Sequence, residues 1–497
     1  MISAPKKALI IGAGPAGLAV SVLLARQGYA VEVLEKNLYP GGRCGRIVRD
    51  GFRFDTGATM MLMPGMYREV FRSLGLDFDT DLPMIRMKNL YTLCFDDGSR
   101  LAFSTDTGAM AQQLELMEPG SAARAARYVE TGYRMYRLAV SRLLARNFTR
   151  WHQFFNLRNV LMLLRLRVFT THTNFTRRYF RDPHLQMAYT YQNIYVGQNP
   201  YTAPALFAMI PSAELTEGSW FPVGGMHALV EKLLAEGEKL GVAVRYRTEV
   251  QRIHTQGNRV TGVVLADGTL READLVVSAA DLPHVYNRLL PTSFMKFRLK
   301  RMRYSCSAIV FHWGVGKRYP QLDHHTIFLS DTYREGMREI FGRKRVGEDP
   351  CFYVHAPVRS DPSAAPEECD ALSVIVAVGH HDPSNTAEWQ SLTEKVREAV
   401  IGKLIRAGLT DLREQIRFEM VFTPPQWEDA VHVARGAVFG SLAHSITQMG
   451  WFRPANRHRR YKNLYFTGGS THPGNGVPMV LMSAKLAAER IASEQPL

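Results

Sequence analysis

Three glycines near the start of the chain have a spacing that could bind a phosphate. Gly12, Gly14 and Gly17 follow a short apolar run, residues 8–11, and open a helical pattern, residues 16–27. In such a turn the first glycine permits the sharp bend, the second lets the backbone approach a pyrophosphate, and the third lets helix and strand pack closely. The start of the helix adds unpaired N–H groups that attract an anion. This spacing predicts a dinucleotide-binding loop.

An acidic residue supports the same interpretation. A second apolar run begins at residue 30 and ends in Glu35, 18 residues after Gly17. A carboxylate at this place accepts hydrogen bonds from ribose hydroxyls and disfavours a nucleotide with a 2′-phosphate, but it does not separate NAD from FAD. Strand, glycine loop, helix and second strand together predict a βαβ unit. A structural glycine turn without a ligand is the alternative.

More glycines and an arginine follow this unit: Gly41, Gly42, Arg43 and Gly57. With the first glycine loop, this stretch resembles the extended N-terminal motif of FAD enzymes related to amine oxidases, carotenoid desaturases and protoporphyrinogen oxidase. The resemblance implies that the fork of N–H donors on Arg43 contacts the pyrophosphate. It also implies that the three glycines let backbone lie against the flavin. For Arg43, a solvated surface position is the alternative.

A second glycine-rich loop lies near the end of the chain. A strand pattern, residues 463–467, leads into Thr-Gly-Gly-Ser-Thr-His-Pro-Gly-Asn-Gly-Val and then into a helical pattern, residues 477–492. This loop resembles the C-terminal flavin motif of the same enzymes, where the helix directs its positive N-terminal end at the flavin ring. In that family, a residue at the place of Val250 contacts adenine through its backbone. The resemblance implies flavin contacts for Gly468, Gly469, Gly476 and Val477.

Two flavin motifs so far apart predict one FAD-binding domain that is assembled from several segments. A chain of 497 residues is also too long for a single core. The expected fold class is α/β: a Rossmann-like FAD-binding domain of the amine oxidase and phytoene desaturase type, an inserted α+β substrate domain, and a helical membrane-binding region. Residues 1–105, 226–295 and 416–497 are expected to bind FAD, residues 106–225 to form the helical region, which also contacts substrate, and residues 296–415 to form the substrate domain.

Three strand patterns in the middle of the chain predict a small β-meander. Residues 242–250, 259–265 and 270–278 alternate or run as strands around an Asp-Gly turn. The third pattern ends in the apolar run Leu275-Val276-Val277. The proline-rich region from 350 to 366 predicts a long loop.

The formal net charge of +15 is distributed unevenly. From Thr131 to Arg181 there is no Asp or Glu, and 11 arginines are interleaved with Leu, Phe, Trp and Met. Such a mixture is typical of helices that lie on anionic lipid. A solvated basic helix pair over an apolar core is the alternative. Nucleic acid binding is not expected, because no recognition fold accompanies the charge.

The five cysteines are scattered, and neither they nor the histidines show the spacing of a zinc site or a disulfide framework. A reducing cytoplasm is therefore the expected compartment. The first seven residues show no secretion-signal pattern. No apolar stretch approaches the roughly 20 residues that a spanning helix needs, so membrane contact is expected to be peripheral.

Four tracts resemble the carotenoid branch of this FAD family, in particular phytoene desaturases and relatives that act on shorter polyenes. They are Trp220-Phe-Pro-x-Gly-Gly225, His324-His325-Thr326, Trp451-Phe-Arg-Pro454 and Thr471-His-Pro-Gly-x-Gly476. One departure is Gly57-Ala58-Thr59, where relatives have Gly-Pro-Thr or Gly-Pro-Ser. The resemblance implies that FAD accepts a hydride while hydrogens leave CH2–CH2 units of a long apolar isoprenoid polyene, which an apolar tunnel must orient. Because there is one Rossmann-type unit, no NAD(P)H site is expected, and oxygen or a quinone is the expected electron acceptor.

Few residues suit the role of proton acceptor. His472 lies inside the C-terminal glycine loop, and its ordinary pKa suits acid–base chemistry. Its alternative role is to hold the loop by hydrogen bonds. Glu339 and His325 are weaker candidates, since both lie in segments equally explicable as surface of the substrate domain. A dedicated base is not required if positioning supplies most of the rate.

Other functions on the same scaffold are alternatives to a desaturase. They are a polyene terminal oxygenase, a saturase, a squalene-pathway dehydroxylase and, less favoured, a non-enzymatic prenyl-binding protein of the Rab GDP-dissociation inhibitor type. The presence of both flavin motifs favours an enzyme over the binding protein. An amine oxidase is disfavoured, because residues 466–482 contain no cysteine to link the flavin.

Overall fold

A five-stranded parallel sheet is built from three distant parts of the chain. The computed structural model describes residues 4–290, 294–381 and 389–496. The strand order is β19-β13-β1-β2-β9, with every neighbouring pair parallel. The strands are β1 (Lys7–Ile11), β2 (Ala30–Leu34), β9 (Ala243–Arg245), β13 (Leu275–Ser278) and β19 (Leu464–Phe466).

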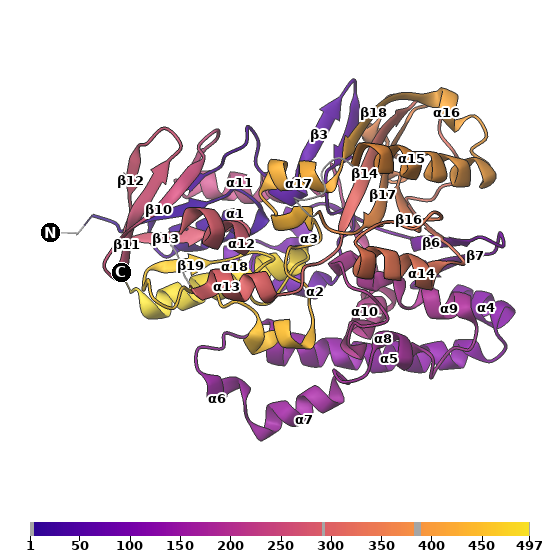
Figure 1. The fold of residues 1–497 in the computed structure, drawn as a ribbon, viewed down its shortest axis with the longest axis horizontal. Helices are drawn as coiled ribbons and strands as arrows, with labels where there is room; N and C mark the ends of the chain where they lie inside the picture. The colour runs from indigo at the N-terminus through magenta and orange to yellow at the C-terminus, as the bar shows by residue number, and fades with distance from the viewer. Residues whose placement is uncertain (1–3, 291–293, 382–388, 497) are drawn as a thin grey trace.

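Helices cover this sheet because its strands are apolar on both faces. Helix α1 (Pro15–Arg26) packs against α11 (Ala228–Lys239) and α18 (Val477–Glu494). Figure 1 shows the indigo start and the yellow end of the chain side by side in this part of the molecule. The predicted βαβ unit and the predicted C-terminal strand and helix are thus present in one α/β layer.

The predicted meander differs from the observed one at both ends. The pattern 242–250 divides into β9, which joins the parallel sheet, and β10 (Val250–Gln256). The pattern 270–278 divides into β12 (Leu270–Glu272) and β13. The meander is therefore β10-β11-β12, with β11 at Arg259–Leu265. The reason is burial: β12 is exposed, whereas the apolar residues of β13 are covered on both faces in the parallel sheet.

A seven-stranded sheet forms the second layer, with the order β18-β14-β17-β16-β15-β6-β7. Its strands are β6 (Asn89–Phe95), β7 (Arg100–Ser104), β14 (Ser307–Val315), β15 (His325–Leu329), β16 (Phe352–His355), β17 (Asp370–Val378) and β18 (Ile416–Phe422). Helix α15 (Trp389–Arg406) packs on it through Val396, Val400 and Leu404.

This sheet draws strands from three of the expected segments and corrects one expected loop. Strands β6, β7 and β18 belong to the seven-stranded sheet, although the expected segments 1–105 and 416–497 place them with FAD binding. The expected loop 350–366 contains β16, so that prediction is wrong there. The strand forms because β16 pairs with β15 on one side and with β17 on the other. Such long-range pairing cannot be predicted from local proline content.

A helical region lies below both sheets in Figure 1. Its helices are α4 (Thr107–Met117), α5 (Ser121–Ala139), α6 (Trp151–Phe154), α7 (Leu157–Arg165), α8 (His172–Thr176), α9 (Pro183–Ala188) and α10 (Met209–Glu217). In the part of the chain that the structure describes, no helix is both long enough and apolar enough to cross a bilayer.

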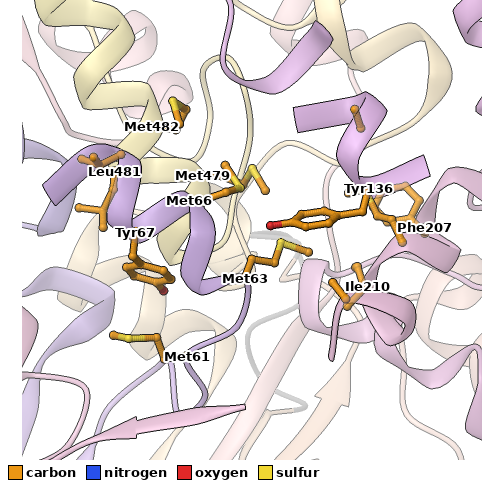
Figure 2. Packing of buried hydrophobic residues seen from close by; sticks show 14 of the residues in the cluster. Met61, Met63, Met66, Tyr67, Tyr136, Phe207, Ile210, Met479, Leu481 and Met482 are labelled. Carbon is orange, nitrogen blue, oxygen red and sulfur yellow. The ribbon is translucent and has the colours of Figure 1, made fainter. Parts of the chain in front are cut away.

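Flexible apolar side chains pack this helical region against the part of the chain that carries the parallel sheet. Figure 2 shows Tyr136 of α5 and Phe207 and Ile210 near Met63 and Met479. Met63 is the residue just before α2 (Pro64–Leu74), and Met479 lies on α18. All belong to one buried cluster. Methionine fills irregular gaps well, so these side chains pack the helical region against the start of α2 and against α18.

Candidate active site

A cavity of ≈ 790 Å³ lies where the parallel sheet, the seven-stranded sheet and the helical region meet. Ile11 and Leu34 line it from the parallel sheet, Val310 and Ile375 from the seven-stranded sheet, and Ile210 from the helical region. Residues of both glycine loops also line it. The two motifs at opposite ends of the chain therefore border one space.

The N-terminal glycine loop is folded as its spacing predicts. Gly12 and Gly14 line the cavity, and Gly17 lies behind them. A Cβ on Gly17 would stand 1.9 Å from the carbonyl oxygen of Gly12, so only glycine lets helix and loop approach this closely. Helix α1 begins at Pro15 with no side-chain cap, which leaves its first N–H groups available to an anion.

Glu35 joins this loop to the end of β2. Its Oε2 accepts a hydrogen bond from the Ala13 N–H at 2.8 Å, and its Oε1 accepts one from the Asn37 N–H at 2.9 Å. The side chain lines the cavity and is buried. Each carboxylate oxygen has a second lone pair, so Glu35 can also accept hydrogen bonds from ribose hydroxyls.

Arg43 lies between the two glycine loops. Its Nη1 donates to the carbonyl oxygen of Val438 at 3.2 Å, and its Nη2 would be 3.4 Å from a Cβ on Gly469. Burial lowers the pKa of Arg43, and the Asp281 carboxylate nearby raises it. The side chain is partly buried and lines the cavity, which favours a binding role over a solvated surface position.

The other N-terminal glycines divide between the cavity wall and the layer behind it. Gly42 and Gly57 line the cavity. Gly41 does not: its N–H donates to the carbonyl of Ala13 at 2.9 Å, and a Cβ there would stand 2.8 Å from the Cys44 oxygen. Gly41 therefore supports the loop from behind.

The C-terminal loop completes the opposite wall. Its four predicted contact residues line the cavity: Gly468, Gly469, Gly476 and Val477. Val250, at the start of β10, lines it as well. Helix α18 begins at Val477 with Gly476 as an uncapped N-cap at φ +96°. Two uncapped helix N-termini thus border one cavity with a buried carboxylate and an arginine. This donor and acceptor set fits the pyrophosphate and ribose of FAD and the negative charge that its ring takes up on reduction.

Two buried charged residues of this site were missed by sequence reasoning. Arg453 donates to the carbonyl oxygens of Gly469 at 2.5 Å and Thr471 at 2.9 Å, and so holds the C-terminal loop. Burial lowers the pKa of Arg453 to about 9. Asp281 lines the cavity and accepts from the Ser441 hydroxyl at 2.6 Å. Arg453 lies in the tract Trp451-Phe-Arg-Pro454, which resembles the carotenoid branch, but the sequence indicated no role for this arginine. No sequence pattern pointed to Asp281.

His472 lines the cavity and also holds the loop. Its Nε2 donates to the carbonyl oxygen of Arg146 at 3.0 Å. Its Nδ1 is buried and has no hydrogen-bond partner among the described residues, so that nitrogen keeps a free lone pair. Burial lowers the pKa of His472 to about 4. The catalytic role of His472 stays a prediction.

The two weaker candidates for a proton acceptor lie away from the cavity. Glu339 does not line it and pairs with Arg343 at 2.5 Å. His325 does not line it either, but it is buried on β15, so the description of it as surface is wrong. Its Nδ1 lies 2.7 Å from the hydroxyl of Tyr353, which in turn donates to Thr59 Oγ1 at 2.9 Å. Tyr353 and Thr59 belong to the cavity wall.

Comparison with known proteins agrees with this geometry. A zeta-carotene-forming phytoene desaturase of Myxococcus xanthus is 38% identical over 488 residues, which cover 98% of this chain and 94% of that protein. A 4,4'-diapolycopene oxygenase of a Methylomonas species is 33% identical over 494 residues, which cover 98% of each chain. The solved structure of an oxidoreductase from Methanosarcina mazei matches with a TM-score of 0.63 at 16% identity, over 97% of this chain and 100% of that one, and supports the fold alone.

The family model described as flavin containing amine oxidoreductase matches residues 15–492, which include both glycine loops. The predicted resemblance, the α/β fold and the FAD cofactor are thereby confirmed. The chain belongs to the family of flavin containing amine oxidoreductases.

Proposed function

We propose that this chain is an FAD-dependent carotenoid desaturase that removes hydrogens from CH2–CH2 units of a long acyclic polyene of the phytoene or diapophytoene type. One observation carries the proposal: the cavity beside both glycine loops continues into an apolar chamber. The chamber is lined by Leu143, Leu144, Leu163, Leu206, Phe207 and Ile210. Such a lining suits a hydrocarbon and offers no partner for a charged amine. The desaturase name of a relative at 38% identity supports the same substrate class.

The side chains of the chamber would align the polyene with the site of FAD and exclude water. When bound, FAD takes up two electrons from each step as a hydride. Each step breaks two C–H bonds and forms one C=C bond, so a proton must also leave the neighbouring carbon. His472 is our proposed acceptor, because it lines the cavity and its buried Nδ1 has no hydrogen-bond partner among the described residues. Its hydrogen bond to Arg146 would give it the second role of fixing the loop.

We propose that the polyene enters from an anionic membrane surface through α6 and α7. Phe155, Val160 and Phe169 line the cavity and are also 44%, 50% and 72% exposed. The opening of the cavity therefore lies within exposed apolar surface. Further exposed apolar side chains surround it: Trp151, Leu157, Leu161 and Leu164.

Exposed arginines accompany this apolar surface. Arg142, Arg150, Arg158 and Arg165 are exposed, and no ion pair joins them to an acid within residues 4–290, 294–381 and 389–496. Unpaired cations beside exposed apolar side chains suit anionic headgroups above an acyl layer. This arrangement favours peripheral lipid contact over a solvated basic surface, because a solvated surface does not need the seven exposed apolar side chains.

The electron acceptor would be oxygen or a quinone. Among the described residues, one glycine loop of Rossmann type lies at the edge of the parallel sheet, which favours a single bound dinucleotide, so we expect no NAD(P)H site. We assign the FAD-binding unit to the expected segments without the strands 89–104 and 416–422. We assign those strands to the substrate domain together with residues 296–415, and we leave the helical region at residues 106–225.

The test is turnover of phytoene, or of its shorter analogue, dispersed in liposomes with the FAD-loaded protein. We expect coloured products, each two hydrogens lighter per step, without NADH or NADPH and faster with an added quinone or oxygen. Mass spectrometry separates the alternatives. Products heavier by oxygen would support the terminal oxygenase, and products heavier by hydrogen the saturase; either result would overturn the desaturase proposal.

A further inference from the structure

Three histidines meet inside the protein, away from the cavity. His325 on β15 pairs in register with His355 on β16, and His324 precedes β15. The exposed fraction is 5% for His324 and 1% for both His325 and His355. Each offers a ring nitrogen, and the three nitrogens all lie within 4.8 Å of one another. Sequence spacing did not find this group, because strand pairing brings His355 to residues about 30 positions away.

The outer nitrogens of two of these rings already have partners. His324 Nδ1 lies 2.8 Å from the hydroxyl of Ser360, and His325 Nδ1 lies 2.7 Å from the hydroxyl of Tyr353. Both rings therefore present Nε2 toward the group. Metal-binding histidines are held in this way, with one nitrogen on the ion and the other on a polar group of the protein.

The inner nitrogens are incompletely satisfied without a ligand. His324 Nε2 and His355 Nε2 are 3.1 Å apart, which allows one hydrogen bond between them. His325 Nε2 is buried and has no hydrogen-bond partner in the described part of the chain. His355 Nδ1 has none either, but it points away from Nε2 of its own ring and would not contact an ion bound there. A buried polar atom without a partner costs free energy, so a ligand at this place would remove that cost.

Charge at the site does not oppose a cation. Two arginines are nearby, but each is neutralised: Arg53 by Asp361 at 2.5 Å and Arg359 by Asp370 at 2.7 Å.

We propose that His324, His325 and His355 form a binding site for a metal ion that prefers imidazole nitrogen, with Zn²⁺ as the probe. Zn–N bonds of about 2.0–2.1 Å in tetrahedral geometry place two ligand nitrogens roughly 3.3 Å apart. The 3.1 Å between His324 Nε2 and His355 Nε2 is close to that spacing. His325 completes the set, because the three ring nitrogens lie within 4.8 Å of one another.

The ion would connect the seven-stranded sheet to the wall of the FAD cavity. His325 holds the Tyr353 hydroxyl, and that hydroxyl donates to Thr59 Oγ1. Thr59 belongs to the stretch after Gly57 that lines the cavity. The site is buried, so its role is structural: it would fix β15, β16 and this stretch relative to one another. The inference does not depend on which substrate the enzyme oxidises.

The experiment is elemental analysis of the tag-free, FAD-loaded full chain produced with zinc in the medium and desalted through a weak chelator. We expect about one zinc ion per chain in the wild type. His355→Gln and His325→Gln should each reduce bound zinc by about tenfold or more. His312→Gln is the matched control, because His312 is equally buried on β14, which β17 separates from β16, and its Nδ1 bonds the Ser373 hydroxyl. The control should keep its zinc.

X-ray absorption at the zinc edge keeps the test independent of whether the variants fold. In the wild type it should show imidazole nitrogens at about 2.0 Å. Zinc absent from the wild type, zinc bound through other ligands, or equal zinc in folded His355→Gln and His312→Gln would each overturn the site.

Discussion

Replacement of Glu35 by leucine tests the dinucleotide loop most directly. The carboxylate is buried between the glycine loop and the end of β2, and its oxygens accept from the N–H groups of Ala13 and Asn37. Leucine has a similar size but accepts no hydrogen bond. The variant therefore removes the ribose acceptor and leaves the Ala13 N–H without its partner.

The expected magnitude follows from these contacts. Loss of the charged hydrogen bonds to ribose should cost about 1.5–3 kcal/mol of binding, which weakens FAD affinity roughly 10- to 100-fold. The unpaired N–H of Ala13 should lower the free energy of unfolding of the apoprotein by about 1–3 kcal/mol. The two effects can be measured separately, because the second is present without FAD.

Titration of each apoprotein with FAD, followed by flavin fluorescence, gives the dissociation constant. Glu32→Leu is the matched control: Glu32 lies on β2, which ends just before Glu35, but it pairs with Arg245 outside the cavity. We expect the control to bind FAD like the wild type. If Glu35→Leu is folded by circular dichroism and its dissociation constant equals that of the control, the assignment of Glu35 to ribose is refuted.

Three further predictions follow from the structure. His472→Ala should reduce turnover by about 10²–10⁴-fold with FAD retained if the histidine accepts the proton, and should mainly loosen FAD if it only holds the loop. Replacement of Arg158, Arg165 and Arg167 by Gln should reduce binding to anionic vesicles by about an order of magnitude or more; indifference to lipid charge would contradict the proposal. Burial lowers the pKa of His312 and of His472 to about 4. Because the unfolded chain takes up these protons near pH 6.5, stability should be full above that pH and fall toward pH 4, as a denaturation midpoint measured across this window would show.

The parts of the site that sequence could predict are those fixed by local geometry. A Cβ on Gly17 would clash with its own loop, and Gly476 stands at a positive φ, so glycine is required at both places and the spacing reveals the loops. The residues that sequence missed act over long range. Arg453 bonds carbonyl groups as far as 18 residues along the chain, and His355 reaches His324 only through strand pairing. Neither contact leaves a periodic pattern.

The same contrast explains why β13 could not be separated from the meander in advance. Residues 270–278 read as one strand, yet the sheet that receives residues 275–278 is formed by β1 and β19 from the two ends of the chain. Local propensity indicates a strand but not its neighbour. The apolar run itself indicated burial, and a covered parallel sheet is the place where both faces of a strand are buried.

The attachment of the helical region to the flavin loop uses groups that are separate from its exposed charges. The Arg146 carbonyl accepts from His472, and the Asn147 side chain donates to the Leu486 carbonyl of α18 at 3.0 Å. Neither bond involves an arginine head group. The substitutions of Arg158, Arg165 and Arg167 should therefore weaken lipid binding and leave the flavin loop intact, so turnover of polyene dispersed in neutral detergent should stay at the wild-type value. A loss of turnover in detergent would show that these arginines act on the chemistry itself and would contradict the separation of lipid contact from catalysis.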